Sequence, residues 1–366
     1  MKNSIGAGLI LTLSGESHGD MICAVLDGLA PGIAVDEDFI ASQLSRRRPS
    51  GPLDTARREK DDFRIVSGVF EGHTTGAPLT ILIPNGDVRS SDYDRFHGLP
   101  RPSHADYAAH VRYAGYEDWR GGGHFSGRIT VGIVAAGAIV LKALERKGIR
   151  IGTHILELSG IRDRDFEVLD DGILGEQIKS VNAMDFPVLS DVRGAMEEKI
   201  LGAKADGDSV GGIVQTAVSG LPAGVGDPWF DSLEGAIANA VFSIGGIKGV
   251  EFGSGFALAG MRGSEAADEF FLEDDTVRTS SNHNGGINGG ISNGMPVVFN
   301  AAVKPTPSIS RPLGTVDLIG GGPAVLKVSG RHDPAIVRRI CIVISSMTAI
   351  VIGDRLSLRF GTDYLR

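Results

Sequence analysis

The sequence predicts a mixed α+β fold with antiparallel or mixed sheets. Strand and helix patterns alternate irregularly along the 366 residues, and many neighbouring strand candidates are separated only by short turns. A doubly wound parallel sheet would instead need a regular alternation, with a crossover helix after each strand. No linker, composition break or internal repeat interrupts the chain, so we expect residues 1–366 to form a single large domain.

The elements of the first 150 residues follow from apolar periodicity and helix caps. Alternating apolar residues predict strands at 9–13, 21–29, 63–70 and 79–83. A helix is expected at 36–45, where Asp36 can cap the first turn, and another at 106–113. The stretch 129–147 is rich in Ala, Val, Ile and Leu and stops before Gly148, which predicts the strongest helix of this half.

The second half follows the same signals. Val and Ile enrichment predicts strands at 150–158, 209–220 and 296–303. Helices are expected at 191–203, with Ser190 as its cap, at 232–242 and at 334–352, where Pro334 stands near the start. The polar stretches 46–62 and 84–104 have no core-forming pattern, and loops of this length in a compact protein are usually functional or mobile.

Composition excludes several classes of protein. Hydrophobic residues make up 42% and charged residues 22%, which is the balance of a globular protein. A net charge of −9 argues against general nucleic-acid binding, so an anionic ligand would need a local basic pocket. The two cysteines, Cys23 and Cys341, each lie in an apolar run and are expected to be buried free thiols. The 52 glycines follow no collagen period and indicate tight loops.

Two observations bear on location. Residues 1–5 lack the apolar core of a secretory signal. The longest apolar stretch, 340–352, is interrupted by hydroxyl residues and falls short of the roughly 20 residues that a membrane span needs. We therefore expect a cytoplasmic protein without a membrane span.

Three histidines lie in short segments rich in groups that bind anions. His18 stands in 15–19 (GESHG), His104 in 101–106 (RPSHAD) and His332 in 330–334 (GRHDP). Histidine can move a proton near neutral pH, and arginine can hold a phosphate or carboxylate through a forked pair of donors. This pairing of residue types predicts proton transfer on a small molecule with several negative charges.

The segment 15–19 also matches the G-x-S-x-G nucleophile elbow of serine hydrolases. An elbow needs a strand before it and a helix after it, at the top of a parallel sheet. Here a strand is predicted on both sides, which disfavours Ser17 as a nucleophile. A polar hairpin turn without chemistry stays open at this point.

The remaining polar loops carry signals of differing strength. Residues 46–51 (RRRPSG), with four more cations before residue 65, could be a solvated charge run or an anion site. Residues 121–128 (GGGHFSGR) end at a helix start and form a plausible phosphate site. Residues 281–294 lack a GxGxxG fingerprint, and their paired glycines could admit a flat ligand or form a structural turn. Asp333 could act as a base or cap a helix, but no metal-ligand spacing occurs beside it.

Taken in order, these segments closely resemble the chorismate synthase family. The match covers nearly the whole chain, and the ordered set is far more specific than any single motif. The matching segments are 15–19 (GESHG), 46–49 (RRRP), 68–72 (GVFEG), 74–76 (TTG), 101–107 (RPSHADY), 120–123 (RGGG), 207–212 (GDSVGG), 248–251 (KGVE), 285–294 (GGINGGISNG), 304–307 (KPTP) and 330–334 (GRHDP).

The resemblance implies a fold, an activity and an assembly. The fold would be a β-α-β sandwich, with helices packed between antiparallel sheets and long loops around the active site. The activity would be a lyase reaction, the 1,4-trans elimination of phosphate from 5-enolpyruvylshikimate 3-phosphate to give chorismate. It belongs to the shikimate pathway of aromatic amino acid biosynthesis and needs reduced FMN without net redox change. The protein would be a homotetramer.

By motif match the resemblance also implies residue roles. His18 would donate a proton to the leaving phosphate, His104 would protonate or stabilise the reduced flavin near N1, and Asp333 would help the flavin N5 accept the C6 proton. The substrate-binding residues would be Arg47, Arg48, Arg128, Arg331 and Ser17. The FMN-binding residues would be Ser126, Gly245, Gly246, Gly289, Lys304, Pro305, Thr306, Pro307, Ser308 and Arg331.

The chain departs from the family pattern at three places. His124-Phe125 replaces an Arg-Ser pair, Gly245-Gly246 replaces Asn-Ala or Pro-Ala, and Leu53 stands where arginine is frequent. The changes bear on FMN contacts and on any contact to NADP. Reduced flavin could come from intrinsic reduction or from a separate flavin reductase, and Leu53 and the lack of a recognisable nicotinamide domain favour the reductase.

Two other function classes remain open from the residues alone. One is a hydrolase that uses Ser17 with His104 or His332. The other is a non-catalytic protein that binds phosphorylated metabolites. Dependence on reduced flavin would separate the lyase from both.

Overall fold

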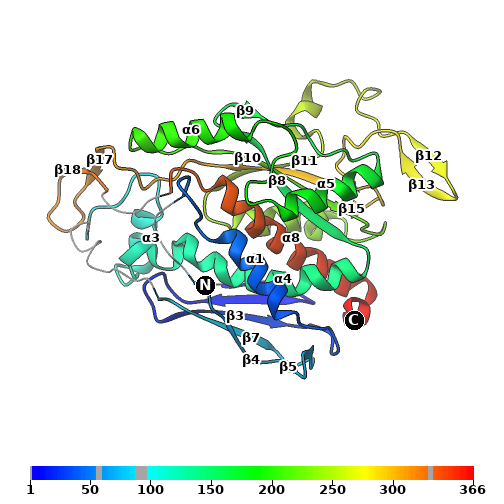
Figure 1. Ribbon diagram of the computed structural model, residues 1–366, viewed down its shortest axis with the longest axis horizontal. Helices are drawn as coiled ribbons and strands as arrows, with labels where there is room; N and C mark the ends of the chain where they lie inside the picture. Colours follow the sequence, from blue (N-terminus) through cyan, green and yellow to red (C-terminus); the bar gives the residue numbers. More distant parts are fainter. Residues whose placement is uncertain (1, 55–59, 87–96, 329–332) are drawn as a thin grey trace.

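Two antiparallel sheets enclose a layer of helices. The computed structural model describes residues 2–54, 60–86, 97–328 and 333–366. Figure 1 shows the layers stacked from the sheet with β3 and β7, through α4 and α8, to the sheet with β8 and β10. This arrangement confirms the α+β class and the predicted β-α-β sandwich.

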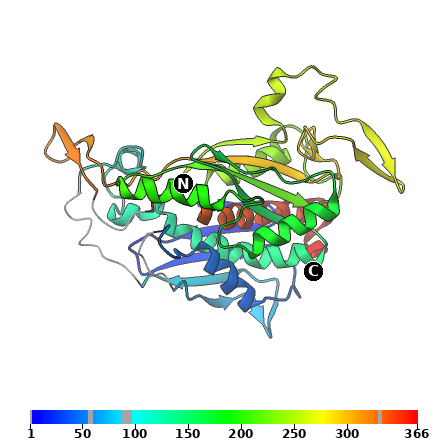
Figure 2. The ribbon, with the colours of Figure 1, turned by 45° about the horizontal axis from the view of Figure 1, so that its top comes forward.

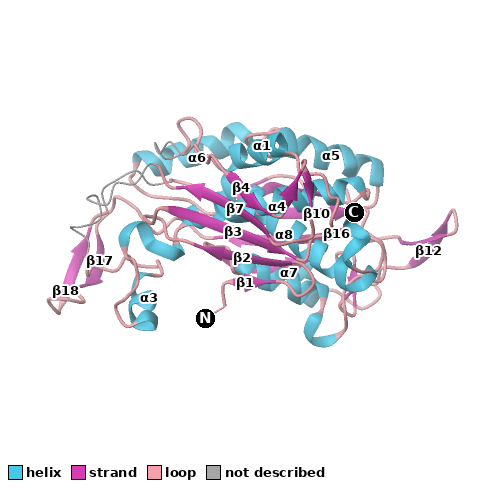
Figure 3. Cartoon of the chain, turned by 90° about the horizontal axis from the view of Figure 1, so that it is seen from below, coloured by secondary structure: helices cyan, strands magenta, loops and turns pink. Residues whose placement is uncertain are grey.

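The first sheet is built from the N-terminal strands and has the order β1-β2-β3-β7-β4 (Figure 3). Along β3 every second residue is buried, namely Ile22, Ala24 and Leu26, and Ile22 pairs with Ile83 of β7. One face of this sheet therefore packs on the helices. Its strands are β1 (Ser4–Ile5), β2 (Ile10–Ser14), β3 (Met21–Asp27), β4 (Arg64–Ser67) and β7 (Leu79–Pro84).

The second sheet has the order β11-β16-β10-β8-β9, and the inner strands β16, β10 and β8 are buried along most of their length. Helices cover both of its faces, because α5 (Asp171–Ala183) packs on the outer side through Leu174, Ile178 and Val181. The strands are β8 (Arg150–Leu158), β9 (Ile161–Arg162), β10 (Gly212–Ser219), β11 (Ile247–Phe252) and β16 (Val297–Val303).

Two long helices form the middle layer, α4 (Thr130–Arg146) and α8 (Val337–Phe360). They approach closely, because a Cβ built on Gly137 would lie 2.5 Å from the Cβ of Ser346. The hydroxyl of Ser345 lies 2.7 Å from that of Thr153 on β8, so a polar residue within the apolar stretch is satisfied inside the core. The helices α1 (Glu37–Arg47) and α7 (Leu233–Phe242) pack beside them.

Smaller elements decorate the sandwich. Figure 2 shows α6 (Arg193–Ala205) lying over the second sheet and the β12–β13 hairpin projecting from one end. The short helix α3 is Asp106–Tyr113. The small hairpins are β5 (Val69–Phe70) with β6 (His73–Thr74), β12 (Phe270–Glu273) with β13 (Thr276–Thr279), β14 (Ile287–Asn288) with β15 (Ile291–Ser292), and β17 (Leu313–Val316) with β18 (Pro323–Leu326).

Several expectations about single elements need correction. Ser190 does not cap α6, because its hydroxyl donates to Asp163 and the helix starts only at Arg193. The predicted loop 46–62 begins later than expected, since α1 runs on through Arg47. The last helix starts after Pro334, at Val337, and extends to Phe360. Asp36 does cap α1, accepting from the Phe39 amide at 2.9 Å.

Two helical segments are long and apolar enough to cross a membrane by length and composition, Gly127–Arg146 and Val337–Phe360. The second is longer than the stretch 340–352 indicated. Their apolar windows are 83% and 94% buried inside the protein, which is the burial of core helices. Both cysteines are free, but only Cys341 is buried as expected, since Cys23 is half-buried. Burial raises the pKa of the Cys341 thiol to about 12.

A buried carboxylate fastens the segment after β9 to the second sheet. Asp163 accepts hydrogen bonds from the amides of Arg164 (2.9 Å) and Leu189 (2.6 Å) and from the Ser190 hydroxyl, and it lies 3.4 Å from Nδ1 of the buried His154. Burial alone would raise the pKa of Asp163, but His154 and these donors outweigh it and lower the pKa to about 2.

We expect Asp163→Asn to lower the free energy of unfolding by about 2 kcal/mol at neutral pH. Because the folded pKa lies below the unfolded value, this contribution is present above about pH 4 and is lost as the pH falls toward about 2. Urea unfolding of both proteins at neutral pH and at about pH 3 measures the difference, which should shrink on acidification. The exposed Asp191→Asn serves as the control, and a pH-independent difference for position 163 would contradict the assignment.

Candidate active site

A cavity of about 530 Å³ opens where α4 and α8 begin. The 3-10 turns Arg120–Phe125 and Gly127–Ile129 form one side, and the α7–β11 connection and the loop after β16 form the other. Its wall contains twelve of the residues proposed for the site, namely Arg47, His104, Ser126, Arg128, Gly245, Gly246, Lys304, Pro305, Thr306, Pro307, Ser308 and Asp333.

His104 is held in a defined orientation by its neighbours. Its Nδ1 lies 2.5 Å from Oδ1 of Asp106, which identifies Nδ1 as the protonated nitrogen and leaves Arg101 to bond Asp106 at 2.8 Å. Burial alone would raise the pKa of Asp106, but hydrogen bonds from Arg101 and His104 outweigh it and hold the pKa well below its ordinary value. An ionised Asp106 therefore fixes the imidazole that lines the cavity.

His18 reaches the same region from the other side of the glycine run. A Cβ on Gly121 would lie 2.6 Å from Nε2 of His18 and 3.0 Å from Oγ of Ser17, while one on Gly122 would lie 3.1 Å from Cε1 of His104. Both glycines have positive φ angles, 59° and 84°. Only glycine can place backbone between the two imidazoles without a clash.

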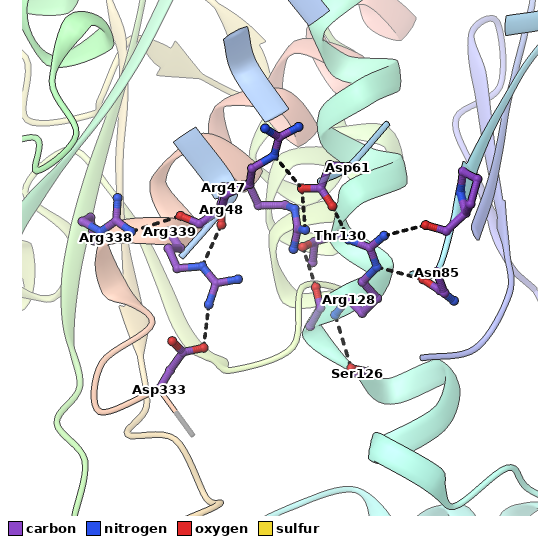
Figure 4. Close-up of polar contacts among 12 residues, drawn as sticks. Arg47, Arg48, Asp61, Asn85, Ser126, Arg128, Thr130, Asp333, Arg338 and Arg339 are labelled. Carbon is purple, nitrogen blue, oxygen red and sulfur yellow. Dashed lines mark hydrogen bonds and ion pairs between the residues drawn. The ribbon is translucent and has the colours of Figure 1, made fainter. Parts of the chain in front are cut away.

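Arginines from two helices meet on one buried carboxylate (Figure 4). Nη2 of Arg47, at the end of α1, lies 2.8 Å from Oδ2 of Asp61, and Nη1 of Arg128 donates to Oδ1 of the same group. Arg48 approaches Asp61 to 3.6 Å and is about one-third exposed. Arg48 is not part of the cavity wall.

Arg128 is also tied to the hairpin that carries His18. Its Nε donates to Oδ1 of Asn85 at 2.9 Å. The amide nitrogen of the same Asn85 side chain donates to the carbonyls of Glu16 and Gly19 at 3.0 and 2.8 Å. The segment 15–19 joins the antiparallel strands β2 and β3, so it is a hairpin loop and not an elbow between strand and helix.

Asp333 is held by an arginine that the motifs did not single out. Arg339, in the first turn of α8, donates through Nη1 to Asp333 at 2.6 Å and through Nε to the carbonyl of Arg47 at 2.7 Å (Figure 4). The adjacent Arg338 pairs with the buried Asp54 and donates to the carbonyl of Arg48 at 3.2 Å. The start of α8 therefore fastens the end of α1.

The opposite wall is cationic and rich in hydroxyls. Lys304 donates to the carbonyl of Ser103, and burial together with the nearby Lys248 lowers the pKa of Lys304. Ser308 accepts from Arg101 at 3.1 Å. The hydroxyl of Thr306 is buried without a hydrogen-bond partner in the described part of the chain, so it is suited to a ligand.

Two of the three departures from the family pattern lie in or beside the cavity wall, whereas Leu53 packs against the hydrophobic core. Nδ1 of His124 lies 2.8 Å from the carbonyl of Gly15, so this side chain joins the glycine run to the hairpin loop. Phe125 lies in the wall and is partly exposed. Gly245 has open space where a Cβ would stand, apart from one carbonyl at 4.0 Å, so a flat ligand can approach the backbone.

The remaining expected residues lie elsewhere. Ser17 is buried beside Gly121 and is not in the wall. Gly289 lies in the β14–β15 turn, next to Gly290, whose carbonyl accepts from the amide of Leu233 at the start of α7, whereas the cavity meets the opposite end of that helix. Arg331, His332, Arg57 and Arg58 lie outside the described residues. Over those same described ranges, no group of three His, Cys, Asp or Glu side chains could hold a metal ion.

These features suit the binding of a small anionic molecule, because the cavity wall is cationic and two imidazoles lie on either side of bare backbone. A chorismate synthase family model matches residues 9–356. Relatives named chorismate synthase include those of Korarchaeum cryptofilum, 43% identical over 96% of each chain, and Pyrococcus abyssi, 44% identical over 97% of each. A crystal structure of a chorismate synthase is 28% identical, covers 97% of this chain and 94% of its own, and superposes with a TM-score of 0.77. The chain belongs to the chorismate synthase family and is therefore an enzyme of the lyase class.

The glycine between the imidazoles yields a test. We expect Gly121→Ala to slow turnover by about 100-fold, because the new methyl group would displace His18 and strain a backbone with positive φ. Steady-state kinetics with circular dichroism as a folding check would measure this. Gly194→Ala, in α6 with nothing within 4 Å of the added Cβ, is the matched control and should leave the rate unchanged. Equal rates for both variants would mean that His18 does not need its observed position.

Proposed function

We propose that the protein catalyses the 1,4-trans elimination of phosphate from 5-enolpyruvylshikimate 3-phosphate to give chorismate, in the shikimate pathway, with reduced FMN as cofactor. The observation that carries this proposal is that one cavity wall contains His104, Asp333, Arg47 and Arg128, with His18 against its glycine run. The substrate carries a phosphate and two carboxylates, and this wall offers guanidinium groups suited to each.

The residues present fit FMN. Gly245 and Gly246 offer bare backbone to a flat ring, and Phe125, Ile336 and Ile340 supply apolar contact. The unpartnered Thr306 hydroxyl, with Lys304 and Ser308, suits the phosphate of the cofactor. When bound, reduced FMN would supply an electron-rich ring that lends and recovers electron density, so that no net oxidation occurs.

The protein groups have separate tasks in this proposal. Arg47 and Arg128 hold the anionic groups of the substrate, and His18 gives a proton to the departing phosphate. His104, which Asp106 orients through Nδ1, would protonate or stabilise the reduced flavin near N1. Asp333, fixed by Arg339, assists removal of the proton from C6. Two ligands that fill the cavity would displace water from it, which would strengthen each of these electrostatic contacts.

A serine hydrolase is disfavoured by position. Ser17 lies in a hairpin loop between antiparallel strands, without the strand–turn–helix geometry that exposes a nucleophile. Incubation with the substrate under anaerobic conditions, with and without photoreduced FMN, decides between the classes. The lyase should release phosphate only with reduced flavin. Release that ignores the flavin and is lost in Ser17→Ala would support a hydrolase, and no release at all would support a binding protein.

We expect His18→Ala and His104→Ala each to slow turnover by roughly 10²–10⁴-fold, since each removes a positioned proton donor. Single-turnover phosphate release with saturating reduced FMN measures the chemical step. His73→Ala, an exposed ring in the β5–β6 hairpin, is the control. Near-normal rates in both test variants would remove the assigned roles.

The proposal extends to the setting of the enzyme. We propose that residues 1–366 act as one domain, supported by one large hydrophobic core that runs through both sheets, with a small second cluster under α5. We also propose a cytoplasmic homotetramer that obtains reduced flavin from a separate reductase. Turnover on NADPH and oxidised FMN, without added reductase, would instead show intrinsic reduction.

A further inference from the structure

Two of the arginines proposed to bind substrate are buried and share one counter-ion. The side chains of Arg47 and Arg128 are 2% and 7% exposed, and that of Asp61 is fully buried. Each arginine uses a different oxygen of the Asp61 carboxylate (Figure 4). Neither the motifs nor the family resemblance singled out Asp61.

Asp61 stands behind the cavity wall rather than in it. Arg47 and Arg128 line the cavity, whereas Asp61 does not. A ligand in the cavity therefore meets the two guanidinium groups, and Asp61 can act on that ligand only through them.

The two arginines come from different elements and repel each other. Arg47 ends α1, and Arg128 lies in the turn that leads into α4. Two buried like charges a few ångströms from one carboxylate would separate if that carboxylate were removed. Arg48 approaches the same carboxylate to 3.6 Å, so Asp61 lies within reach of three guanidinium groups.

Asp61 also lies in the middle of a chain of hydrogen bonds and ion pairs that crosses the site. On one side, Arg47 is fastened through its carbonyl to Arg339, which holds Asp333. On the other side, Arg128 is fastened to Asn85, which holds the carbonyls of the loop carrying His18. The Asp61 carboxylate therefore joins the half of the site with Asp333 to the half with His18.

We infer that Asp61 is a positioning residue that holds Arg47 and Arg128 in the spacing needed to bind the phosphate of the substrate. This inference rests on the proposed function for the identity of the substrate, but the arginine spacing concerns any phosphate group. The predicted consequence is a loss of anion affinity with little change in the chemical step.

The test compares Asp61→Asn, which is nearly isosteric, with Asp61→Ala and with the control Asp62→Asn, an exposed neighbour. For each full-length protein, KM and kcat are measured with reduced FMN, and the affinity for inorganic phosphate is measured by titration calorimetry. We expect Asp61→Asn and Asp61→Ala to raise KM and the phosphate Kd by about 10- to 100-fold, the usual worth of a charge-assisted contact. The value of kcat should fall much less, and Asp62→Asn should behave as the wild type.

Each other outcome overturns the inference. An unchanged KM and phosphate Kd in folded Asp61→Asn would show that the arginines keep their spacing without the carboxylate. A lower Kd would show that Asp61 competes with the ligand, and a fall in kcat alone would place its effect on chemistry. If Asp61→Ala does not fold, the Asn variant decides. If the wild type does not turn over the substrate, the proposed function fails, and phosphate affinity still decides the role of Asp61.

Discussion

A buried guanidinium group must pair with an anion or donate to a carbonyl. This requirement determines how the segments around the cavity are arranged. Arg47, Arg128 and Arg338 are almost completely buried, and each pairs with a carboxylate from a loop, Asp61 or Asp54. Removing one partner of such a pair would leave an uncompensated charge in a low-dielectric interior. The loop carboxylates therefore fix where α1, α4 and α8 lie relative to one another, and the site inherits that geometry.

Local patterns predicted most of the architecture because each sheet buries one face or both in a regular way. The alternation in β3 and the Val/Ile enrichment of β16 depend only on neighbours along the chain, and both strands lie where expected. The helix α5 escaped prediction because Gly172 and Gly175 weaken its signal, although Leu174, Ile178 and Val181 face the core. Serine is a common helix cap, but the hydroxyl of Ser190 donates instead to the buried carboxylate of Asp163.

In the candidate site, too, sequence patterns do not reveal contacts between segments that are distant in the chain. His18, His104 and the arginine run stand in motifs and could be named from the sequence. Asp61, Asn85 and Arg339 could not, because their importance comes from contacts with residues far away in the sequence. Asp61 and Asn85 contact Arg128 across 67 and 43 positions, and Arg339 contacts Arg47 across 292. A lone aspartate in a charged loop, such as Asp61, has no sequence feature that distinguishes a buried partner of several arginines from a solvated residue. Only the fold, which brings α1, β7 and α8 to one point, gives these residues their roles.

The two core helices both begin at the cavity. Thr130, the first residue of α4, lies in its wall, and so does Ile336, which precedes the first residue of α8. The amide ends of two long helices therefore lie at the cavity, and their dipoles favour an anion there without depending on the protonation of any side chain. The same two helices form the hydrophobic layer between the sheets, so their N-terminal ends at the cavity are packed as firmly as the centre of the protein. Substitutions in the surrounding loops can therefore change the cavity without moving these helix ends, which could shift only if the whole interior repacked.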